Sequence, residues 1–209
     1  MIDVLLVGAS GLAREVAAAA GDRIQVAGIL DDNPELHGSR IDGIDVLGAV
    51  LDAAHFRIPL LLCVGAGRAR QAIADRLAGH GVGDERFATF VDPSVRIPAG
   101  CTVGPGSVLL AGVVLTCAVR LGRHCVVMPN VTLTHDNTLN DFVTVAAGVS
   151  LGGGVTIDKG AYLGMNASIR QNVTIGARAT VGMGAVVLHD VPAGETWAGV
   201  PAEAVLVRA

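Results

Sequence analysis

Aliphatic side chains recur every six residues through the second half of the chain. The series runs from Val91 to Val187, and all 17 of its positions hold Val, Ile or Leu. A second series lies four residues after each of these, and Asn137 is its one member that is neither small nor β-branched. This pattern is typical of a parallel β-helix, in which three hexads form one triangular coil. It predicts a prism with aliphatic side chains stacked inside and no loop interrupting the register between 91 and 191.

Residues 1–90 follow another pattern, in which apolar runs alternate with amphipathic segments. The runs IDVLLVG, IQVAGILDD and LLLCVG predict buried strands, and GLAREVAAAA and GRARQAIADRLAGHG predict helices. An alternation of strands and helices implies a parallel α/β sheet. We therefore expect two domains, a Rossmann-like α/β domain at 1–90 and a β-helix with a C-terminal cap at 91–209. We expect Trp197 to belong to that cap.

Composition agrees with a prism too narrow for aromatic rings. Aromatic residues make up only 3% of the chain, whereas glycine occurs 28 times. We expect glycines to turn the prism corners, since they adopt left-handed backbone angles without steric cost. The glycines concerned are Gly104, Gly122, Gly164, Gly176 and Gly182.

Charge and hydropathy exclude several classes of function. The net charge is −4 and no basic run occurs, so we expect no nucleic-acid partner. No apolar stretch reaches the ~18 residues of a spanning helix, so we expect no membrane insertion. The N-terminus carries Asp3 and no basic segment before its apolar run, unlike a signal peptide. Four cysteines without a CxxC pair predict reduced thiols and a cytoplasmic protein.

A glycine-rich turn follows the first expected strand. The segment Gly8-Ala9-Ser10-Gly11 precedes a helix, and a phosphate can bind at a helix N-terminus. It is not a GxGxxG motif, so a plain tight turn is an equal alternative. Asp31 and Asp32 end the second expected strand, where carboxylates can accept hydrogen bonds from a base or ribose.

The segments GASGLAREV, LDDNPELHG and VGAGRARQ, followed by the hexads, resemble one family of bacterial sugar acetyltransferases. These enzymes acetylate UDP-linked 4-amino sugars or perosamine, and the family includes sialic acid O-acetyltransferases. The resemblance implies a left-handed β-helix, a homotrimer and acetyl-CoA as co-substrate. It implies N-acetylation of a nucleotide-linked amino sugar of the 4-amino-4,6-dideoxy type, with O-acetylation of sialic acid or another sugar as the alternative. The implied nucleotide-sugar site comprises Gly8, Ser10, Gly11, Leu12, Asp31, Asp32, Gly65 and Arg68.

One histidine stands beside an acid at the break in the second series. His135 and Asp136 immediately precede Asn137. A histidine titrates near pH 6.5, which suits a general base that accepts a proton from an attacking amine. The resemblance places the base at His135 and makes Asp136 the carboxylate that orients its ring. Cys117 offers a covalent route through an acetylated thiol, which we do not favour.

Residues three hexads apart stack in one column of a prism, so Gly153 lies one coil beyond His135. Glycine there lets a thioester approach, and a main-chain N–H can stabilise the oxyanion. The resemblance implies acetyl-CoA contacts at Thr144, Gly153, Gly154, Ala161, Gly199 and Pro201. Thr144 stands where several relatives carry a second histidine. Glu203 stands where a basic residue is common, which leaves Arg178 or Arg208 to meet the CoA phosphates.

Two other functions share the prism. A β-helical carbonic anhydrase needs three histidines on zinc, but His124 and His135 are not in one column and no third histidine lies near them. We therefore expect no metal. A non-enzymatic scaffold would not explain the His-Asp pair at the break. Outward apolar residues Val114, Val126 and Val186 predict faces that pack against other copies of the chain.

Overall fold

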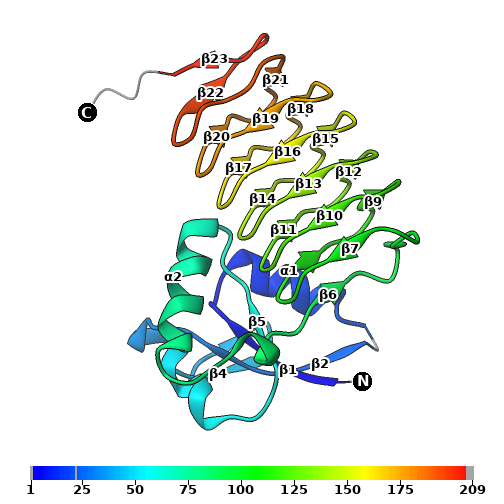
Figure 1. Cartoon of the computed structure of the whole chain (residues 1–209). Helices are drawn as coiled ribbons and strands as arrows, with labels where there is room; N and C mark the ends of the chain where they lie inside the picture. Colours follow the sequence, from blue (N-terminus) through cyan, green and yellow to red (C-terminus); the bar gives the residue numbers. More distant parts are fainter. Residues whose placement is uncertain (1, 22, 206–209) are drawn as a thin grey trace.

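The N-terminal part of the chain is a small α/β layer. A computed structural model describes residues 2–21 and 23–205 (Figure 1). Its five-stranded sheet has the order β3-β4-β2-β1-β5, and only the β3–β4 pair is antiparallel. The strands are β1 (Ile2–Val7), β2 (Ile24–Leu30), β3 (Arg40–Ile41), β4 (Ile44–Gly48) and β5 (Leu60–Leu62). The α-helices are α1 (Gly11–Ala19) and α2 (Gly67–Ala78), and 3-10 helices span Pro34–Leu36, Val50–His55 and Asp84–Arg86.

The hexads form a left-handed parallel β-helix of short strands. Strand partners in adjacent coils are three hexads apart, as in Arg120 with Thr138. Face 1 contains β8 (Val108–Leu109), β11 (Val126–Val127), β14 (Thr144–Val145), β17 (Tyr162–Leu163) and β20 (Thr180–Val181). Face 2 contains β9 (Val114–Leu115), β12 (Thr132–Leu133), β15 (Ser150–Leu151), β18 (Ser168–Ile169) and β21 (Val186–Val187). Face 3 contains β7 (Thr102–Val103), β10 (Arg120–Leu121), β13 (Thr138–Leu139), β16 (Thr156–Ile157) and β19 (Thr174–Ile175).

Three more strands complete face 1 at its two ends. β6 (Phe90–Val91) pairs with β8, and β22 (Thr196–Ala198) pairs with β20 and with β23 (Glu203–Ala204). Trp197 packs against the prism core. The aliphatic series fills the interior as predicted, with one exception. Ile97 lies in no strand and is 41% exposed, because residues 92–101 cross to the first complete coil without pairing. The predicted register itself continues across this stretch, because Val91 pairs with Leu109, 18 residues further on. The prediction of an uninterrupted register is wrong only at its C-terminal end, where Val191 bridges to Ile175, 16 residues away.

The corners turn at a different position of the hexad from the one predicted. Left-handed backbone angles recur every six residues from Gly100 to Gly184. Non-glycine residues hold many of these corners: Ala118, His124, Asn130, Asp136, Phe142, Asn166, Asn172 and Arg178. The five predicted corner glycines have no such angle. They are small because the next coil lies close: a Cβ on Gly104 would lie 2.5 Å from the carbonyl carbon of Gly122.

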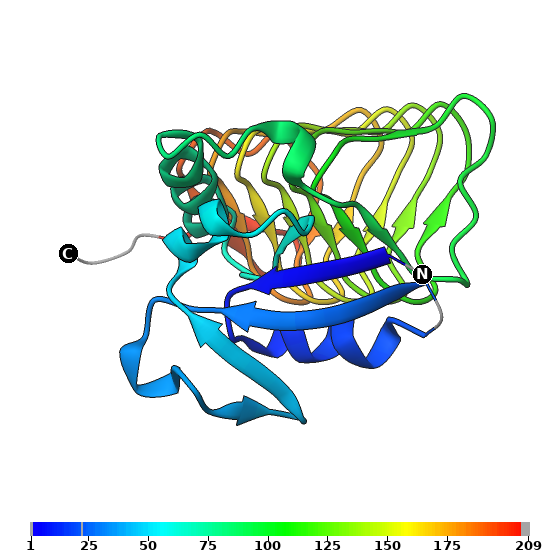
Figure 2. The ribbon, with the colours of Figure 1, turned by 90° about the horizontal axis from the view of Figure 1, so that it is seen from below.

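The two parts of the chain meet through a buried arginine. Arg70 of α2 is fully buried and donates to the carbonyl oxygens of Val64, Gly65, His124, Phe142 and Val143 at 2.7–3.0 Å. Nearby, a Cβ on Gly67 would collide with the Phe142 carbonyl, so only glycine permits this approach. The junction places α2 against the prism, and Figure 2 shows the sheet in front of the stacked coils. A boundary near residue 90 stays a prediction.

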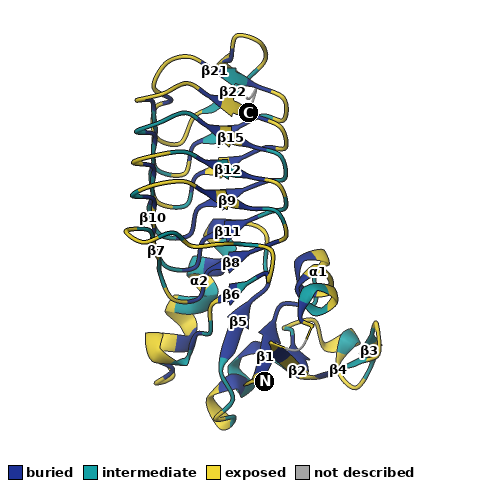
Figure 3. Ribbon diagram, turned by 90° about the vertical axis from the view of Figure 1, so that its right-hand side faces the viewer, coloured by how far each residue is buried: buried dark blue, intermediate teal, exposed yellow. Residues whose placement is uncertain are grey.

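The N-terminal layer also covers part of face 1. Val108 and Val126 are buried in the same cluster as Leu12 and Val16 of α1. The prediction that Val126 is an outward apolar residue free to meet another copy is therefore wrong, because α1 and the sheet bury it. Val114 on face 2 remains 47% exposed, and Figure 3 shows exposed residues along the corner turns. No helix in the described part of the chain is long and apolar enough to cross a membrane.

Candidate functional site

His135 and Asp136 lie in the turn from β12 to β13, at the corner between faces 2 and 3. Nδ1 of His135 lies 2.8 Å from Oδ2 of Asp136, and both side chains are 66% exposed. Asp136 holds the left-handed corner position with a φ of 61°. When the Nδ1–H group donates a hydrogen bond to the carboxylate, Nε2 is unprotonated and presents its lone pair to solvent. The pair therefore has the geometry of a general base held by its neighbour.

The His135 ring lies over Gly153 in the next coil. A Cβ on Gly153 would collide with both Cε1 and Nε2 of the ring. The absent side chain therefore makes room for the imidazole, whereas the sequence predicted that it makes room for the thioester. The adjacent Gly154 donates its N–H to the His135 carbonyl at 2.9 Å and adopts a φ of 69°. Both predicted glycines therefore contact the His135 segment.

The glycine-rich turn after β1 is built by side chains that the sequence assigned to ligand binding. Ser10 caps α1, accepts from the Leu12 N–H at 3.1 Å and donates to the Cys63 carbonyl at 2.6 Å. Asp31 accepts from the Ala9 N–H at 2.7 Å and from the Asn33 N–H at 2.8 Å. Gly8 has a φ of 104°, and a Cβ there would collide with Val64. These groups shape the turn, and Gly8 itself is buried.

Among the described residues, Asp32 and Arg68 make no side-chain hydrogen bond to that turn. Asp32 accepts from the Val50 N–H at 3.1 Å and forms an ion pair with Arg76 of α2. Arg68 is exposed on the first turn of α2. Neither residue borders the pocket described next, so the structure does not bring the whole predicted nucleotide-sugar set together.

A pocket of about 400 Å³ opens between the N-terminal layer and face 1. Of the predicted residues it gathers Ser10, Gly11, Leu12, Gly65 and Thr144. The rest of its lining was not predicted to bind a ligand, namely Glu15, Val126, Met128, Ala146, Ala147, Tyr162 and Met165. Spacing could have found Tyr162, which lies one coil beyond Thr144 and is its strand partner. We call this cavity the interdomain pocket.

The predicted acetyl-CoA residues are spread over different sides of one prism. Thr144 lies on face 1, and its hydroxyl donates to the Gly65 carbonyl at 2.8 Å, so that donor is already engaged. Ala161 is fully buried inside the prism and has no surface for a ligand, so this prediction is wrong. Gly199 and Pro201 are exposed at the far end, where the Gly199 carbonyl accepts from Val186 of β21. Only Gly153 and Gly154 share the corner of His135.

A second pocket, of about 520 Å³, lies farther along the same corner. It contains Arg170, Gln171, Asn172, Val173, Leu188, His189 and Asp190. Gln171 and His189 continue the column of His135 and Gly153 through the next two coils. Arg170, a cation beside this column, is not among the predicted residues. Of the two arginines it named, Arg178 is exposed at another corner, between faces 3 and 1, and Arg208 lies outside the described residues.

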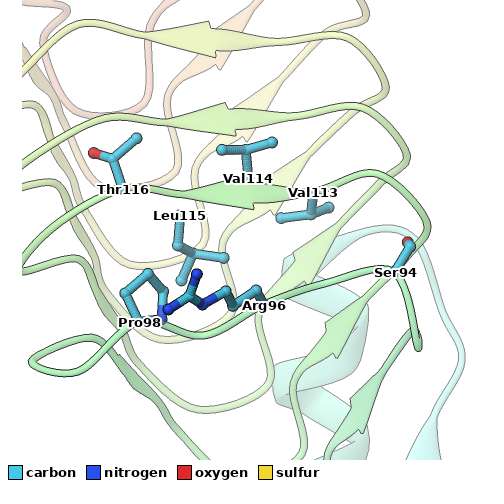
Figure 4. A pocket seen from close by; sticks show the side chains of 7 residues that line it. All are labelled: Ser94, Arg96, Pro98, Val113, Val114, Leu115 and Thr116. Carbon is cyan, nitrogen blue, oxygen red and sulfur yellow. The ribbon is translucent and has the colours of Figure 1, made fainter.

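A third pocket, of about 450 Å³, lies on face 2 beside β9. Figure 4 shows the Arg96 side chain extending along Pro98 below Leu115, with Val114 above. The pocket is lined by one cationic side chain and an exposed valine, and it contains no pair of groups suited to acid–base catalysis.

Residues 2–21 and 23–205 contain no group of three His, Cys, Asp or Glu side chains that could hold a metal ion. His124 is 1% exposed and lies between the rings of Phe87 and Phe142, at centroid distances of 4.6 and 5.0 Å.

Known proteins resemble the chain in both of its parts. Residues 3–77 match the family described as the PglD N-terminal domain, and residues 154–189 match the bacterial transferase hexapeptide (six repeats). No curated protein sequence matches the chain.

Solved structures share the whole architecture. The acetyltransferase domain of PglB from Neisseria gonorrhoeae, in complex with acetyl coenzyme A, is 29% identical, with a TM-score of 0.88 over 97% of this chain and 98% of that one. PerB from Caulobacter crescentus, in complex with CoA and GDP-perosamine, is 28% identical, with a TM-score of 0.87 over 97% of each chain. WeeI from Acinetobacter baumannii is 26% identical, with a TM-score of 0.83 over 98% of this chain and 100% of that one.

These matches agree with the site geometry. The N-terminal match covers Ser10, the start of α1 and Gly65, which line the interdomain pocket, and the solved structures extend over both domains and the His135 corner. A His-Asp pair on a hexapeptide prism, joined to this α/β domain, is thus found in a chain built throughout like known acetyltransferases. The chain is a hexapeptide-repeat acetyltransferase with a PglD-type N-terminal domain.

Proposed function

We propose that the protein transfers the acetyl group of acetyl-CoA to the amino group of a nucleotide-linked amino sugar of the 4-amino-4,6-dideoxy type. The observation that carries this proposal is the His135–Asp136 pair at 2.8 Å, exposed at the corner of the prism. The relatives support it, since one was solved with acetyl coenzyme A and another with CoA and GDP-perosamine.

The chemistry is a direct attack within a ternary complex. The amine nitrogen attacks the thioester carbonyl carbon, while Nε2 of His135 accepts the amine proton and Asp136 stabilises the resulting imidazolium. The C–S bond then breaks, the carbonyl reforms as an amide, and the CoA sulfur leaves with the proton that His135 returns. No covalent enzyme intermediate is needed, so Cys117 takes no part.

The positions of the two half-sites support a homotrimer. In a three-faced prism the corner between faces 2 and 3 is opposite face 1, so His135 lies on the far side from the interdomain pocket of its own chain. We propose that His135 meets the interdomain pocket of a neighbouring subunit. Acetyl-CoA then follows the corner from Gly153 past Arg170 and His189, whose side chains can meet its phosphates. We also propose a cytoplasmic location, because the four cysteines are free.

A direct assay tests the proposal. UDP-, GDP- and dTDP-linked 4-amino-4,6-dideoxy sugars are each mixed with acetyl-CoA, and the release of CoA thiol is followed. We expect one of them to be N-acetylated, and we expect its nucleotide to raise the melting temperature, because a ligand that binds only the folded state stabilises it. Acetylation of sialic acid or another hydroxyl acceptor, with no reaction at any amine, would replace the proposal by the O-acetyl alternative.

Two substitutions separate the base from its partner. H135A should lower kcat by at least ~10³-fold with the Kd for acetyl-CoA almost unchanged, since the base acts in the chemical step. D136N should lower kcat by a smaller factor, because the imidazole remains but loses its orienting charge. H80A is the matched control: His80 is exposed in the N-terminal part, bonded only to the Arg76 carbonyl, and its loss should leave kcat unchanged. An H135A variant with wild-type turnover would refute the assignment.

A further inference from the structure

Asn137 is the one polar side chain in the inner row of its corner. The residues of that row are Cys101, Val119, Asn137, Val155, Val173 and Val191. Asn137 is fully buried, so its amide has no access to water. A buried amide without full hydrogen bonding costs free energy that a valine would not. Core stability therefore does not explain why an asparagine occupies this position next to the His135–Asp136 pair.

The amide of Asn137 makes one bond and leaves one acceptor unused. Nδ2 donates to the Gly152 carbonyl in the next coil at 2.7 Å. Oδ1 is buried and has no hydrogen-bond partner among the described residues. The side chain therefore serves one bond only, and that bond holds the Gly152 carbonyl toward the inside of the prism.

The direction of that carbonyl fixes the direction of the following N–H. In a planar trans peptide the C=O and N–H vectors are antiparallel. The Gly152 carbonyl points inward to Asn137, so the Gly153 N–H points outward. It makes no hydrogen bond within residues 2–21 and 23–205. The His135 ring lies over this same glycine.

We propose that Asn137 is a positioning residue, which aims the Gly153 N–H at the thioester carbonyl oxygen as its negative charge develops. This inference rests on the proposed function. A fixed donor of this kind stabilises the oxyanion without reorganising during the reaction, and one such donor is worth roughly 10²–10³-fold in kcat. Asn137 acts through the Gly152–Gly153 peptide and does not itself touch the substrate.

The chain shows which substitutions its prism tolerates. Val119 and Val155 hold the same row one coil before and one coil after, so N137V should fold. Elsewhere, small inner side chains donate across the same sequence separation: Ser107 Oγ to the Gly122 carbonyl at 3.0 Å, and Cys125 Sγ to the Asn140 carbonyl at 3.2 Å. N137S therefore keeps a donor near the Gly152 carbonyl, whereas N137V removes it.

The test compares N137V, N137S and the control S107A. We expect N137V to lower kcat about 10- to 100-fold, with the KM for acetyl-CoA changed less than about threefold and the melting temperature equal to or above that of the wild type. N137S should recover most of the lost kcat. S107A removes a bond of the same kind from a coil remote from His135, so it should lower the melting temperature and leave kcat unchanged.

Two results would overturn the inference. One is an N137V enzyme with wild-type kcat; the other is a loss of kcat in N137V that N137S does not recover. A fall in melting temperature with kcat retained would likewise show a purely structural role. Failure of the proposed function looks different, since then the wild type would acetylate no amino sugar, or H135A would remain active.

Discussion

At the scale of single residues, the site depends on the absence of a side chain at Gly153. Gly153 has no left-handed backbone angle, so alanine suits its backbone. Yet a Cβ there would overlap Cε1 and Nε2 of His135 more closely than any real contact allows. The imidazole must then leave its place, although the prism itself is undisturbed.

We therefore expect G153A to lower kcat at least ~10-fold with little change in melting temperature, because a displacement of about 1 Å in a catalytic group costs far more rate than stability. Steady-state kinetics and thermal unfolding of the purified variant measure both quantities. A G153A enzyme with full kcat would show that the ring does not need this position.

At the scale of elements, the residues at the prism corners differ more from coil to coil than those of the strands do. His124, Phe142, Gly160 and Arg178 occupy left-handed corners of one column in successive coils. His124 and Phe142 stack in this column with an interplanar angle of 13°. Burial lowers the pKa of His124 from 6.5 to about 4, aided by the charges of Arg123 and Arg70 and opposed by Asp84 and Asp141.

This shift predicts a pH dependence of stability. Above pH 6.5 the imidazole is neutral in both states and contributes no slope. Between pH 6.5 and about 4 the imidazole is protonated in the unfolded chain but not in the folded chain, so the free energy of unfolding decreases as the pH is lowered. Below about pH 4 the contribution is constant. The full loss is about 3 kcal/mol, at about 1.36 kcal/mol per pKa unit.

The variant H124N isolates this contribution. Asparagine holds other left-handed corners, as at Asn130 and Asn166, so the backbone should accept it. Denaturant unfolding at several pH values should show a weaker dependence between pH 6.5 and 4 in H124N than in the wild type, although the variant loses ring stacking. Identical pH profiles for the two proteins would contradict the assignment of this slope to His124.

The sequence predicted those features that repeat. Six-residue periodicity is sufficient to place the prism interior, because every aliphatic position except Ile97 lies in a strand. It also located the His135–Asp136 pair through the break at Asn137. Periodicity could not reveal contacts between segments far apart in sequence, such as the bonds of Arg70 to the prism or the burial of Val126 beneath α1. It could not distinguish a glycine required by backbone angle from one required by a close coil, as at Gly104.

At the scale of the whole molecule, one chain contains two separated halves of the proposed site. His135 is exposed at the corner between faces 2 and 3, whereas the interdomain pocket lies over face 1. Arg70 holds the N-terminal layer rigidly against its own prism, so the layer cannot swing round to the corner. In a cyclic trimer each contact is heterologous, and one surface of a subunit meets a different surface of its neighbour.

This arrangement predicts complementation between two inactive variants. H135A lacks the base, and G11W fills the interdomain pocket, where a Cβ on Gly11 meets no atom within 4 Å. In randomly mixed trimers about one contact in four joins an intact His135 to an intact pocket, so about a quarter of wild-type activity should return. Sedimentation should show trimers for each variant. If base and pocket of the same chain worked together, the mixture would stay inactive, because no subunit has both; recovered activity therefore requires a site shared between subunits.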